Sequence, residues 1–405
     1  MPSFEEARQL VLSNITRLGT ERVELLESVG RVLAEDVVAP WDMPLCDNSA
    51  MDGFAVRAAD CADARPLPVS GYILAGGEVT GALRPGCAIR IMTGAPVPPG
   101  CDAVIPIEET ETTDEQVRPA ATVVPGQHVR RAGEDVRQGE TAVPAGTLIR
   151  PPEISMLASF GKLMVPVFRR ARVAIVSTGD ELIEAGEPLA PGKIINSNSL
   201  SLAAALKEIG AVPVLIGIAR DNVESHREKM IEGLKADALI TSAGVSAGDR
   251  DLVRDVLAGL GVKQLFWRVG MKPGGPTAFG LKDGKPVFSL PGNPVSTMIT
   301  FEEFVRPALL KMMGHRRVLK PFARAVLQHD VNKKAGKIQF LRVRLQSANG
   351  ALVACSSGDQ NTGILKTMLQ ADGIAVLPAD RTSFSAGEPV NVHILSGNAE
   401  MLEEA

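Results

Sequence analysis

Carboxylates recur directly after short apolar runs in the middle of this 405-residue chain. Ser177-Thr178-Gly179-Asp180-Glu181-Leu182 places two of them after a turn-forming glycine, and Asp221 and Asp251 follow later runs. Hard carboxylate oxygens suit Mg²⁺, which proteins hold through one or two of them together with substrate phosphate. Glu181, Asp221 and Asp251 are therefore candidates for magnesium and phosphate chemistry.

Cationic and small residues in the same part of the chain suit an oxyanion. Arg268 and Lys272 follow a further apolar run, and segment 241–251 reads TSAGVSAGDRD. Small residues let backbone amides approach an anion closely. Asn196-Ser197-Asn198-Ser199 adds helix caps and free N–H groups. No GxGxxG follows a strand and no GxxxxGK[ST] occurs, so neither a dehydrogenase nor a P-loop NTPase is expected.

Alternating strands and helices must position these residues. The apolar runs that predict strands cover 172–177, 212–218, 238–242, 264–269 and 286–290. The helical stretches between and after them cover 200–209, 223–234, 252–260 and 295–313. Near-continuous apolar strands that alternate with helices predict a parallel, doubly wound sheet covered on both faces. Ligands of such sheets bind outside the carboxyl ends of the strands, so we expect one crevice there to receive Glu181, Asp221, Asp251, Arg268 and Lys272.

The flanking segments predict three further parts. Ser3 to Glu6 has capping-box spacing before a helix, and a second amphipathic stretch covers 23–29. Short apolar runs between Pro/Gly turns predict a β-rich domain, with strands at 54–56, 71–74, 88–92, 103–107 and 120–124. A helix is expected over 152–160. A C-terminal β domain is expected from apolar runs at 323–328, 339–345, 352–356, 373–377 and 389–394.

Composition excludes several classes of protein. The 43 Lys and Arg residues against 47 Asp and Glu residues give a net charge of −4, without the basic footprint of a nucleic-acid binder. The five cysteines show no CxxC or Cys/His spacing, which argues against a disulfide framework and a structural zinc site and fits a reducing cytosol. No signal peptide and no membrane span are expected. These features predict a cytoplasmic, multi-domain protein.

Specific motifs over nearly the whole length resemble those of the molybdopterin molybdenumtransferases, the bacterial MoeA family that includes the E domain of gephyrin. Besides the segments above, the motifs that carry the resemblance are DNSAMDGFA at 47–55, RIMTGAP at 90–96, KPG at 272–274, LPGNP at 290–294, QFLR at 339–342 and LP at 377–378. Family members insert molybdenum from molybdate into adenylylated molybdopterin in a Mg²⁺-dependent reaction that releases AMP and the molybdenum cofactor.

The resemblance implies a four-part homodimer. Residues 1–44 and 136–170 would form the helical, dimer-forming part, and residues 45–135 the β-rich domain that reaches over the other subunit. Residues 171–318 would form the α/β molybdopterin-binding-like domain, and residues 319–405 a β-barrel-like C-terminal domain. The active site would be shared between subunits. The implied partners are the molybdopterin adenylyltransferase and molybdoenzyme chaperones, with neither nucleic acid nor membrane among them.

The resemblance also implies roles for individual residues. Asp221 and Asp251 are assigned to Mg²⁺, Glu181 to pterin or metal, and Arg268 and Lys272 to phosphate or molybdate. Asp52 and Thr93 would close the site from the other subunit. The further positions expected to bind the pterin, its phosphates or molybdate are Gly179, Asp180, Asn196, Ser197, Ser242, Gly244, Ser246, Gly248, Pro291, Gly292, Pro294 and Arg342, the last together with Thr362.

Two departures from the family pattern concern cationic positions. Gly275 stands where the family often has a second Lys, which removes a positive charge near the oxyanion. Arg268 stands where Lys is common, which keeps the charge but offers a planar fork instead of a point charge. The alternatives are insertion of tungstate, another pyrophosphate-processing enzyme that shares the α/β domain, and a non-enzymatic scaffold. Adenylyltransferases and CinA-type pyrophosphatases lack the module that carries Asp52 and Thr93. A scaffold is disfavoured because the chain has no long linker and no fused further domain.

Overall fold

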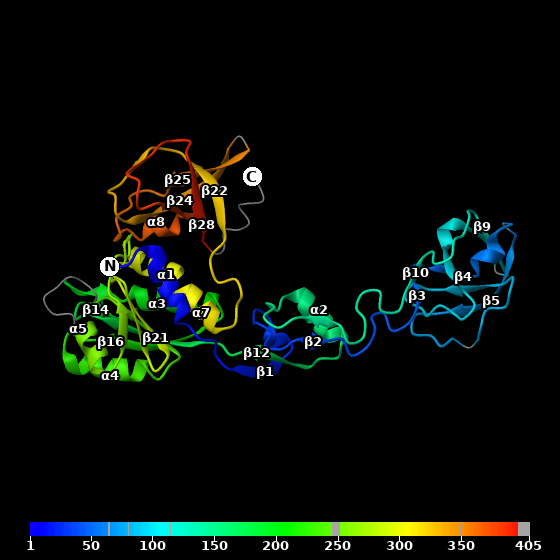
Figure 1. Cartoon of the computed structure of the whole chain (residues 1–405), viewed down its shortest axis with the longest axis horizontal. Coiled ribbons are helices and arrows are strands. Elements are labelled where there is room, and N and C mark those ends of the chain that lie inside the picture. Colours follow the sequence, from blue (N-terminus) through cyan, green and yellow to red (C-terminus); the bar gives the residue numbers. More distant parts are fainter. Residues whose placement is uncertain (64, 80, 114, 245–251, 349, 396–405) are drawn as a thin grey trace. The chain divides into compact units, whose positions relative to one another are not determined.

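The structure is a computed structural model that describes residues 1–405 apart from 64, 80, 114, 245–251, 349 and 396–405. Its chain divides into two compact units (Figure 1). Unit 1 consists of Met1–Val23, Gly30–Ala34 and Pro166–Ala405, and unit 2 consists of Glu24–Val29 and Glu35–Val165. The chain therefore begins unit 1, forms unit 2, and returns to complete unit 1. The predicted α/β multi-domain fold is confirmed.

Unit 1 contains a six-stranded sheet that carries the predicted crevice edge. In sheet order its strands are β16 (Val212–Ala219), β13 (Arg172–Thr178), β17 (Ala238–Ser242), β21 (Lys285–Leu290), β20 (Ala278–Lys282) and β18 (Lys263–Phe266). The first four are parallel, whereas β20 is antiparallel to both neighbours. The expectation of a wholly parallel sheet is thus wrong at β20. Asp283-Gly284, with φ of 52° and 78°, forms the tight turn of a β20–β21 hairpin.

Helices cover both faces of this sheet, as expected for a doubly wound fold (Figure 1). They are α3 (Ser197–Glu208), α4 (Val223–Gly233), α5 (Leu252–Gly259), α6 (Pro294–Thr300) and α7 (Arg306–Met312). Along β13, Val173 and Ile175 share a core with Leu202 of α3, while Val176 shares another with Met230 of α4. Because successive side chains of a strand point to opposite faces, α3 and α4 lie on opposite sides of the sheet.

The first helix of the chain closes the core of unit 1. α1 (Phe4–Ser13) begins with the predicted capping box, in which Ser3 and Glu6 bond each other's backbone N–H. Phe4 is buried, and its ring lies 5.5 Å from that of Phe304 and 5.0 Å from that of Phe340. The predicted helix over 295–313 is interrupted by a π-helical turn, η4 (Phe301–Val305), between α6 and α7.

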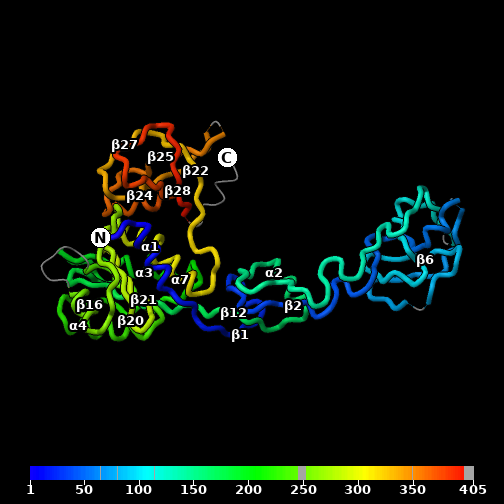
Figure 2. The backbone as a smooth tube through the Cα atoms, viewed as in Figure 1, coloured from blue at the N-terminus to red at the C-terminus, as the bar shows by residue number. Residues whose placement is uncertain are grey.

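The C-terminal strands close into a barrel, in agreement with the sequence. In sheet order the strands are β24 (Ile338–Ala348), β25 (Ala351–Ser356), β22 (Phe322–Leu327), β28 (Pro389–Ile394) and β26 (Gly373–Leu377), and β26 pairs back to β24. Figure 2 labels β22, β24, β25 and β28 in the backbone trace. Two short pairs lie beside it: β23 (Val331–Asn332) with β27 (Ser383–Phe384), and β19 (Met271–Lys272) with β24. The short helix α8 (Lys366–Leu369) lies between β25 and β26 in sequence.

Unit 2 is built on a six-stranded, mostly antiparallel sheet. In sheet order its strands are β7 (Ala103–Pro106), β4 (Gly53–Val56), β6 (Ala88–Ile91), β5 (Leu67–Ile73), β9 (Gln116–Pro119) and β8 (Thr110–Thr112). Further elements are β2 (Val37–Val38), β3 (Asn48–Ser49), β10 (Val129–Arg130), β11 (Thr141–Val143) and α2 (Pro151–Ser159).

Two sequence-based expectations outside the α/β domain are wrong. The run 120–124 lies outside any strand, and β9, whose Val117 is buried, precedes it instead. The amphipathic stretch 23–29 is divided between β1 (Thr20–Glu24) and a 3₁₀ turn, η1 (Leu26–Ser28).

β12 (Met164–Phe168) follows α2. Among the described residues, no helix is both long enough and apolar enough to cross a membrane.

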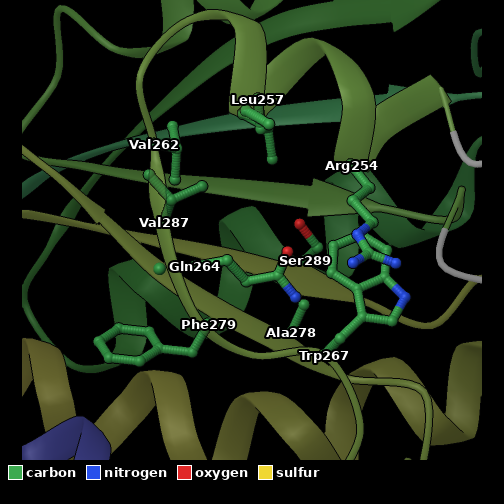
Figure 3. Close-up of a pocket in the computed structure, with 11 residues that line it drawn as sticks. Arg254, Leu257, Val262, Gln264, Trp267, Ala278, Phe279, Val287 and Ser289 are labelled. Carbon is green, nitrogen blue, oxygen red and sulfur yellow. The ribbon is translucent and has the colours of Figure 1, made fainter.

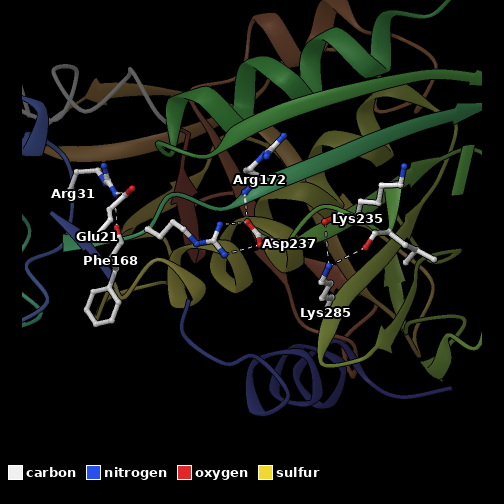
Figure 4. A network of polar contacts seen from close by, with 9 residues as sticks. Glu21, Arg31, Phe168, Arg172, Lys235, Asp237 and Lys285 are labelled. Atoms are coloured by element: carbon white, nitrogen blue, oxygen red, sulfur yellow. Dashed lines mark hydrogen bonds and ion pairs between the residues drawn. The ribbon is translucent and has the colours of Figure 1, made fainter. Parts of the chain in front are cut away.

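A polar network holds the amino ends of the sheet strands in unit 1 (Figure 4). Asp237 accepts two hydrogen bonds from the Arg169 guanidinium, at 2.7 and 2.8 Å, and one from the backbone N–H of Arg172 at 2.8 Å. Burial opposes ionisation of Asp237, but these donors outweigh it and hold the pKa of Asp237 below its usual value. The edge of the sheet away from the predicted site is therefore fixed by charge-assisted hydrogen bonds.

Candidate active site

A cavity of about 290 Å³ lies at the carboxyl edge of the α/β sheet, where β13, β17 and β21 end. Part of its wall comes from two short paired strands, β14 (Leu182–Ile183) and β15 (Ile194–Ile195). Six of the predicted site residues line it, namely Glu181, Asn196, Ser197, Ser242, Gly292 and Pro294. The fold thus brings together side chains from separate loops where sheets of this kind bind their ligands.

Asn196 begins α3 and lines the cavity. Its Oδ1 accepts from the hydroxyl of Ser177 at 2.9 Å and from the backbone N–H of Ser199 at 3.4 Å, so the side chain caps the helix. Asn196 is 2% exposed, and its Nδ2 has no hydrogen-bond partner among the described residues. Because an unpaired buried amide costs free energy, this donor is suited to a ligand.

Asn198 ties three segments of the cavity wall together. Its Nδ2 donates to Ser242 Oγ at 3.0 Å and to the carbonyl oxygen of Gly292 at 2.8 Å. Since a carbonyl only accepts, the second bond fixes the orientation of the amide. Asn198 is absent from the predicted site residues, although its place two residues after Asn196 at a helix start is a signal that could identify it.

Two exposed isoleucines give the cavity an apolar side. Ile194 and Ile195 line it and are 59% and 40% exposed. Apolar walls with a few fixed polar groups are typical of sites for small organic ligands. Neither residue is among the predicted site residues, because an Ile-Ile pair in sequence usually indicates a buried strand.

Gly179 lets the Glu181 carboxylate lie against the backbone. Its φ is 140°, and a Cβ at this position would lie 2.3 Å from Glu181 Oε2. The backbone conformation therefore favours glycine, and any side chain here would push the flexible Glu181 carboxylate aside. The turn after β13 positions the Glu181 carboxylate in this way.

Asp180 and Asp221 lie together beside this turn. The backbone N–H of Asp180 donates to Asp221 Oδ2 at 3.2 Å, and the N–H of Asp221 donates to Asp180 Oδ1 at 3.1 Å. The Arg220 guanidinium bonds the carbonyl of Leu182 at 2.8 Å. Asp221 follows β16 at the edge of the sheet and does not line the cavity that contains Glu181. Within the described part of the chain, no group of three acidic, His or Cys side chains could hold a metal.

Arg268 follows β18 at the opposite edge of the sheet from β16. It comes directly after Trp267, whose ring lies 5.4 Å from the guanidinium carbon of Arg254 (Figure 3). Trp267 and Arg254 border a separate cavity of about 20 Å³. The structure therefore does not gather Arg268 into the cavity that contains Glu181.

Lys272 lies in β19, which pairs in parallel with β24 of the barrel, so that Lys272 is opposite Gln339. It lines another cavity, of about 690 Å³, together with residues 332–337 and Gln339. A Cβ added at Gly275, three residues further along the chain, would lie 3.2 Å from the carbonyl oxygen of Met271. Lys272 is therefore placed at a junction between the α/β domain and the barrel.

The loop after β21 joins the cavity to the barrel. A Cβ on Gly292 would lie 3.0 Å from the Cβ of Ala243, which has a φ of 75°. Pro291 accepts through its carbonyl from the Thr297 hydroxyl at 2.6 Å. Asn293 Nδ2 donates to Thr362 Oγ1 of the barrel at 2.8 Å. Thr362 thus contacts the cavity loop directly.

Arg342 is completely buried in β24 and does not line the cavity. Its guanidinium donates to Thr367 Oγ1 at 2.9 Å and to the carbonyls of Asp359 and Asn361 at 2.9 and 3.2 Å. Burial lowers the pKa of Arg342. In this structure Arg342 holds the backbone of the loop that presents Thr362.

The small-residue loop after β17 is described only at its start. Gly244 has a φ of 73°, and a Cβ there would lie 2.3 Å from Val253 Cγ2, so glycine is required. Of the predicted site residues, Ser246, Gly248 and Asp251 lie outside the described residues.

Asp52 and Thr93 form a pair in unit 2. Asp52 Oδ1 accepts from the Thr93 hydroxyl at 2.6 Å and from the Thr93 backbone N–H at 2.7 Å. The hydroxyl and then the N–H lower the pKa of Asp52. This exposed carboxylate is thus kept ionised and oriented.

Comparison with known proteins covers almost the entire chain. Residues 2–161 match the MoeA N-terminal region (domain I and II), residues 174–311 the probable molybdopterin binding domain, and residues 324–395 the MoeA C-terminal region (domain IV). The chain is 38% identical to molybdopterin molybdenumtransferase 2 of Mycobacterium tuberculosis, over 97% of this chain and 99% of the relative. It is 34% identical to the molybdopterin molybdenumtransferase of Haemophilus influenzae, over 97% and 98%. A crystal structure of the molybdopterin biosynthesis MoeA protein of Pyrococcus horikoshii superimposes with a TM-score of 0.85 at 32% identity, over 98% of this chain and 100% of that one.

Proposed function

Because the chain belongs to the molybdopterin molybdenumtransferase family, we propose that it inserts molybdenum from molybdate into adenylylated molybdopterin and releases AMP in a Mg²⁺-dependent reaction. The observation that supports this most is the cavity at the carboxyl edge of the sheet. There Glu181, Asn196 and Asn198 surround a space with one apolar side, which suits a flat heterocycle that carries polar edges.

The residues of this chain bind and orient the substrate. The unpaired Nδ2 of Asn196 is a donor for the ring, and Asn198 keeps the surrounding loops at a fixed spacing. Ile194 and Ile195 exclude water from one face of the ring. The Glu181 carboxylate, which lies close to Gly179, accepts a proton or hydrogen bond from the substrate.

The paired Asp180 and Asp221 carboxylates fit Mg²⁺, which proteins hold through one or two carboxylates and substrate phosphate. We assign Asp221 to this ion together with Asp251. When bound, Mg²⁺ neutralises charge on the phosphoryl oxygens of the bond that breaks. Arg268 and Lys272 add positive charge for phosphate or molybdate.

A second copy of the chain would complete the site with Asp52 and Thr93, so the working form is a homodimer. The pterin arrives from a molybdopterin adenylyltransferase and the product leaves to molybdoenzyme chaperones. All five cysteines are free thiols, which supports a cytoplasmic location.

The test is a turnover assay with adenylylated molybdopterin, Mg²⁺ and molybdate, in which AMP and active cofactor are measured. AMP release that requires both Mg²⁺ and molybdate is the expected result. A folded protein that binds the pterin but releases no AMP would contradict the proposal. A parallel series with tungstate shows which oxyanion is the substrate.

A further inference from the structure

A second cavity in unit 1, of about 690 Å³, is lined by four lysines, and the reaction above leaves three of them, Lys333, Lys334 and Lys337, without a role. Its lining includes Lys272, Lys333, Lys334 and Lys337. None of the described residues that line it is acidic. Four positive side chains therefore share one hollow in a chain whose net charge is −4.

The loop that carries three of these lysines, residues 333–337, is held in place by hydrogen bonds within the loop and to residues 379–382. The Lys333 ammonium donates to the carbonyl of Lys337 at 3.0 Å, across the turn of the loop. The N–H of Lys333 bonds Thr382 at 2.8 Å, and the N–H of Gly336, whose φ is 91°, bonds Ala379 at 2.8 Å. The loop is thus ordered before any ligand arrives, which lowers the entropic cost of binding.

Lys272 reaches the same hollow from the α/β domain. The parallel pairing of β19 with β24 fixes Lys272 opposite Gln339, and both residues line the cavity. The lysine cluster is therefore assembled from two domains of unit 1 by backbone hydrogen bonds.

Like charges that line one cavity repel one another, and the repulsion is relieved when an anion binds between them. Lys334 and Lys337 are exposed, whereas Lys333 is half-buried. Burial lowers the pKa of Lys333, although Asp380 opposes this change. Ammonium groups are compact donors that bind phosphate as point charges. The volume lies in the range of small-molecule sites and exceeds the need of a single oxyanion.

We propose that Lys333, Lys334 and Lys337 form, together with Lys272, a binding site for the phosphate groups of a phosphorylated small molecule. The proposal rests on the proposed function only for the identity of that molecule, the adenylylated pterin or the AMP released from it. Free molybdate is also an oxyanion, so the experiment compares the binding of phosphate-containing ligands with the binding of molybdate.

The experiment titrates the full-length protein with inorganic diphosphate, AMP and molybdate by isothermal titration calorimetry. The test variant is Lys334→Gln/Lys337→Gln, which removes two exposed charges. The control variant, Lys207→Gln/Lys263→Gln, removes the same charge from exposed lysines that do not line this cavity. The test variant should bind diphosphate and AMP about 10- to 100-fold more weakly, because it lacks two ammonium groups whose attraction to phosphate is reduced by their exposure to water. The control should bind like the wild type, and molybdate affinity should be equal in all three proteins.

Three results would overturn the proposal: no diphosphate binding by the wild type, equal binding by test and control variants, or weakening of molybdate alone. Lys337→Glu provides a second variant, and thermal unfolding shows that each protein is folded. Because diphosphate binding is measured without turnover, its loss in the test variant supports the site even if the wild type releases no AMP. Conversely, if the test variant releases AMP and binds diphosphate as the wild type does, the lysine site is refuted and the proposed function still stands.

Discussion

Substitution of Gly179 by alanine tests whether the Glu181 carboxylate can keep its position only because residue 179 has no side chain. The new Cβ would lie 2.3 Å from Oε2 and 2.6 Å from Oε1 of Glu181, so the carboxylate must move away. The φ of 140° adds backbone strain, which costs about 1–3 kcal/mol of unfolding free energy at a non-glycine residue. If the displaced carboxylate binds the reacting substrate, kcat/KM should fall by about 100-fold.

A matched control separates strain from displacement. Gly186 also has a positive φ, of 99°, but a Cβ there meets nothing within 4 Å. Gly186→Ala should therefore be destabilised without a comparable loss of turnover. Unfolding in urea can be followed by the fluorescence of Trp267 in a Trp41→Phe background, since the chain has only these two tryptophans.

The decisive measurement is a double-mutant cycle with Glu181→Gln. If Gly179 acts only through Glu181, the double variant should turn over as slowly as Glu181→Gln alone, while the stability loss of Gly179→Ala persists. Full turnover by Gly179→Ala, or losses that multiply in the double variant, would refute the reasoning.

Thr93→Val removes a hydroxyl donor, so the pKa of Asp52 should rise toward 3.8, and a carboxyl NMR titration that shows no rise would exclude the pairing. Asp237→Asn should lower the unfolding free energy by about 1–3 kcal/mol near neutral pH, toward the low end because its arginine partner is partly exposed. Because the pKa of Asp237 is lowered in the folded protein, this stabilisation is present above pH 3.8, the usual pKa of an aspartate, and is lost as the pH falls below that value. The urea unfolding curves of the wild type and Asp237→Asn should therefore converge in acid, and a difference that stays constant with pH would contradict this. Arg254→Ala should cost about 0.5–1 kcal/mol and shift the emission of Trp267, whereas unchanged emission would show that the two groups are not in contact.

Local pattern was sufficient to predict the strands that carry the cavity. The apolar runs before Ser177, Ser242 and Gly292 correspond to β13, β17 and β21, and the rule that ligands bind at carboxyl ends indicates the loops that follow. The barrel strands were equally visible, because their inward residues alternate or form short apolar runs.

Strand order and long-range pairing could not be read from the same pattern. Asp221 and Arg268 follow strands at opposite edges of the sheet, and only tertiary packing decides that order. The pairing of Lys272 with Gln339 joins segments distant in sequence. The antiparallel β20 is not among the predicted strands, although Asp283-Gly284, a typical hairpin turn, follows it.

The position of α1 has a consequence for synthesis of the chain on the ribosome. Phe4 leaves the ribosome among the first residues, but Phe304 and Phe340, against which it packs, are made roughly 300 residues later. At a translation rate of about 5–20 residues per second, roughly 15 to 60 s pass between the synthesis of α1 and the synthesis of the residues against which it packs. During that interval residues 35–165 emerge in full and can fold as their own unit. The amino terminus of the nascent chain is therefore an amphipathic segment whose apolar face, with Phe4, Ala7 and Val11, a chaperone could recognise until the last third of the protein is made.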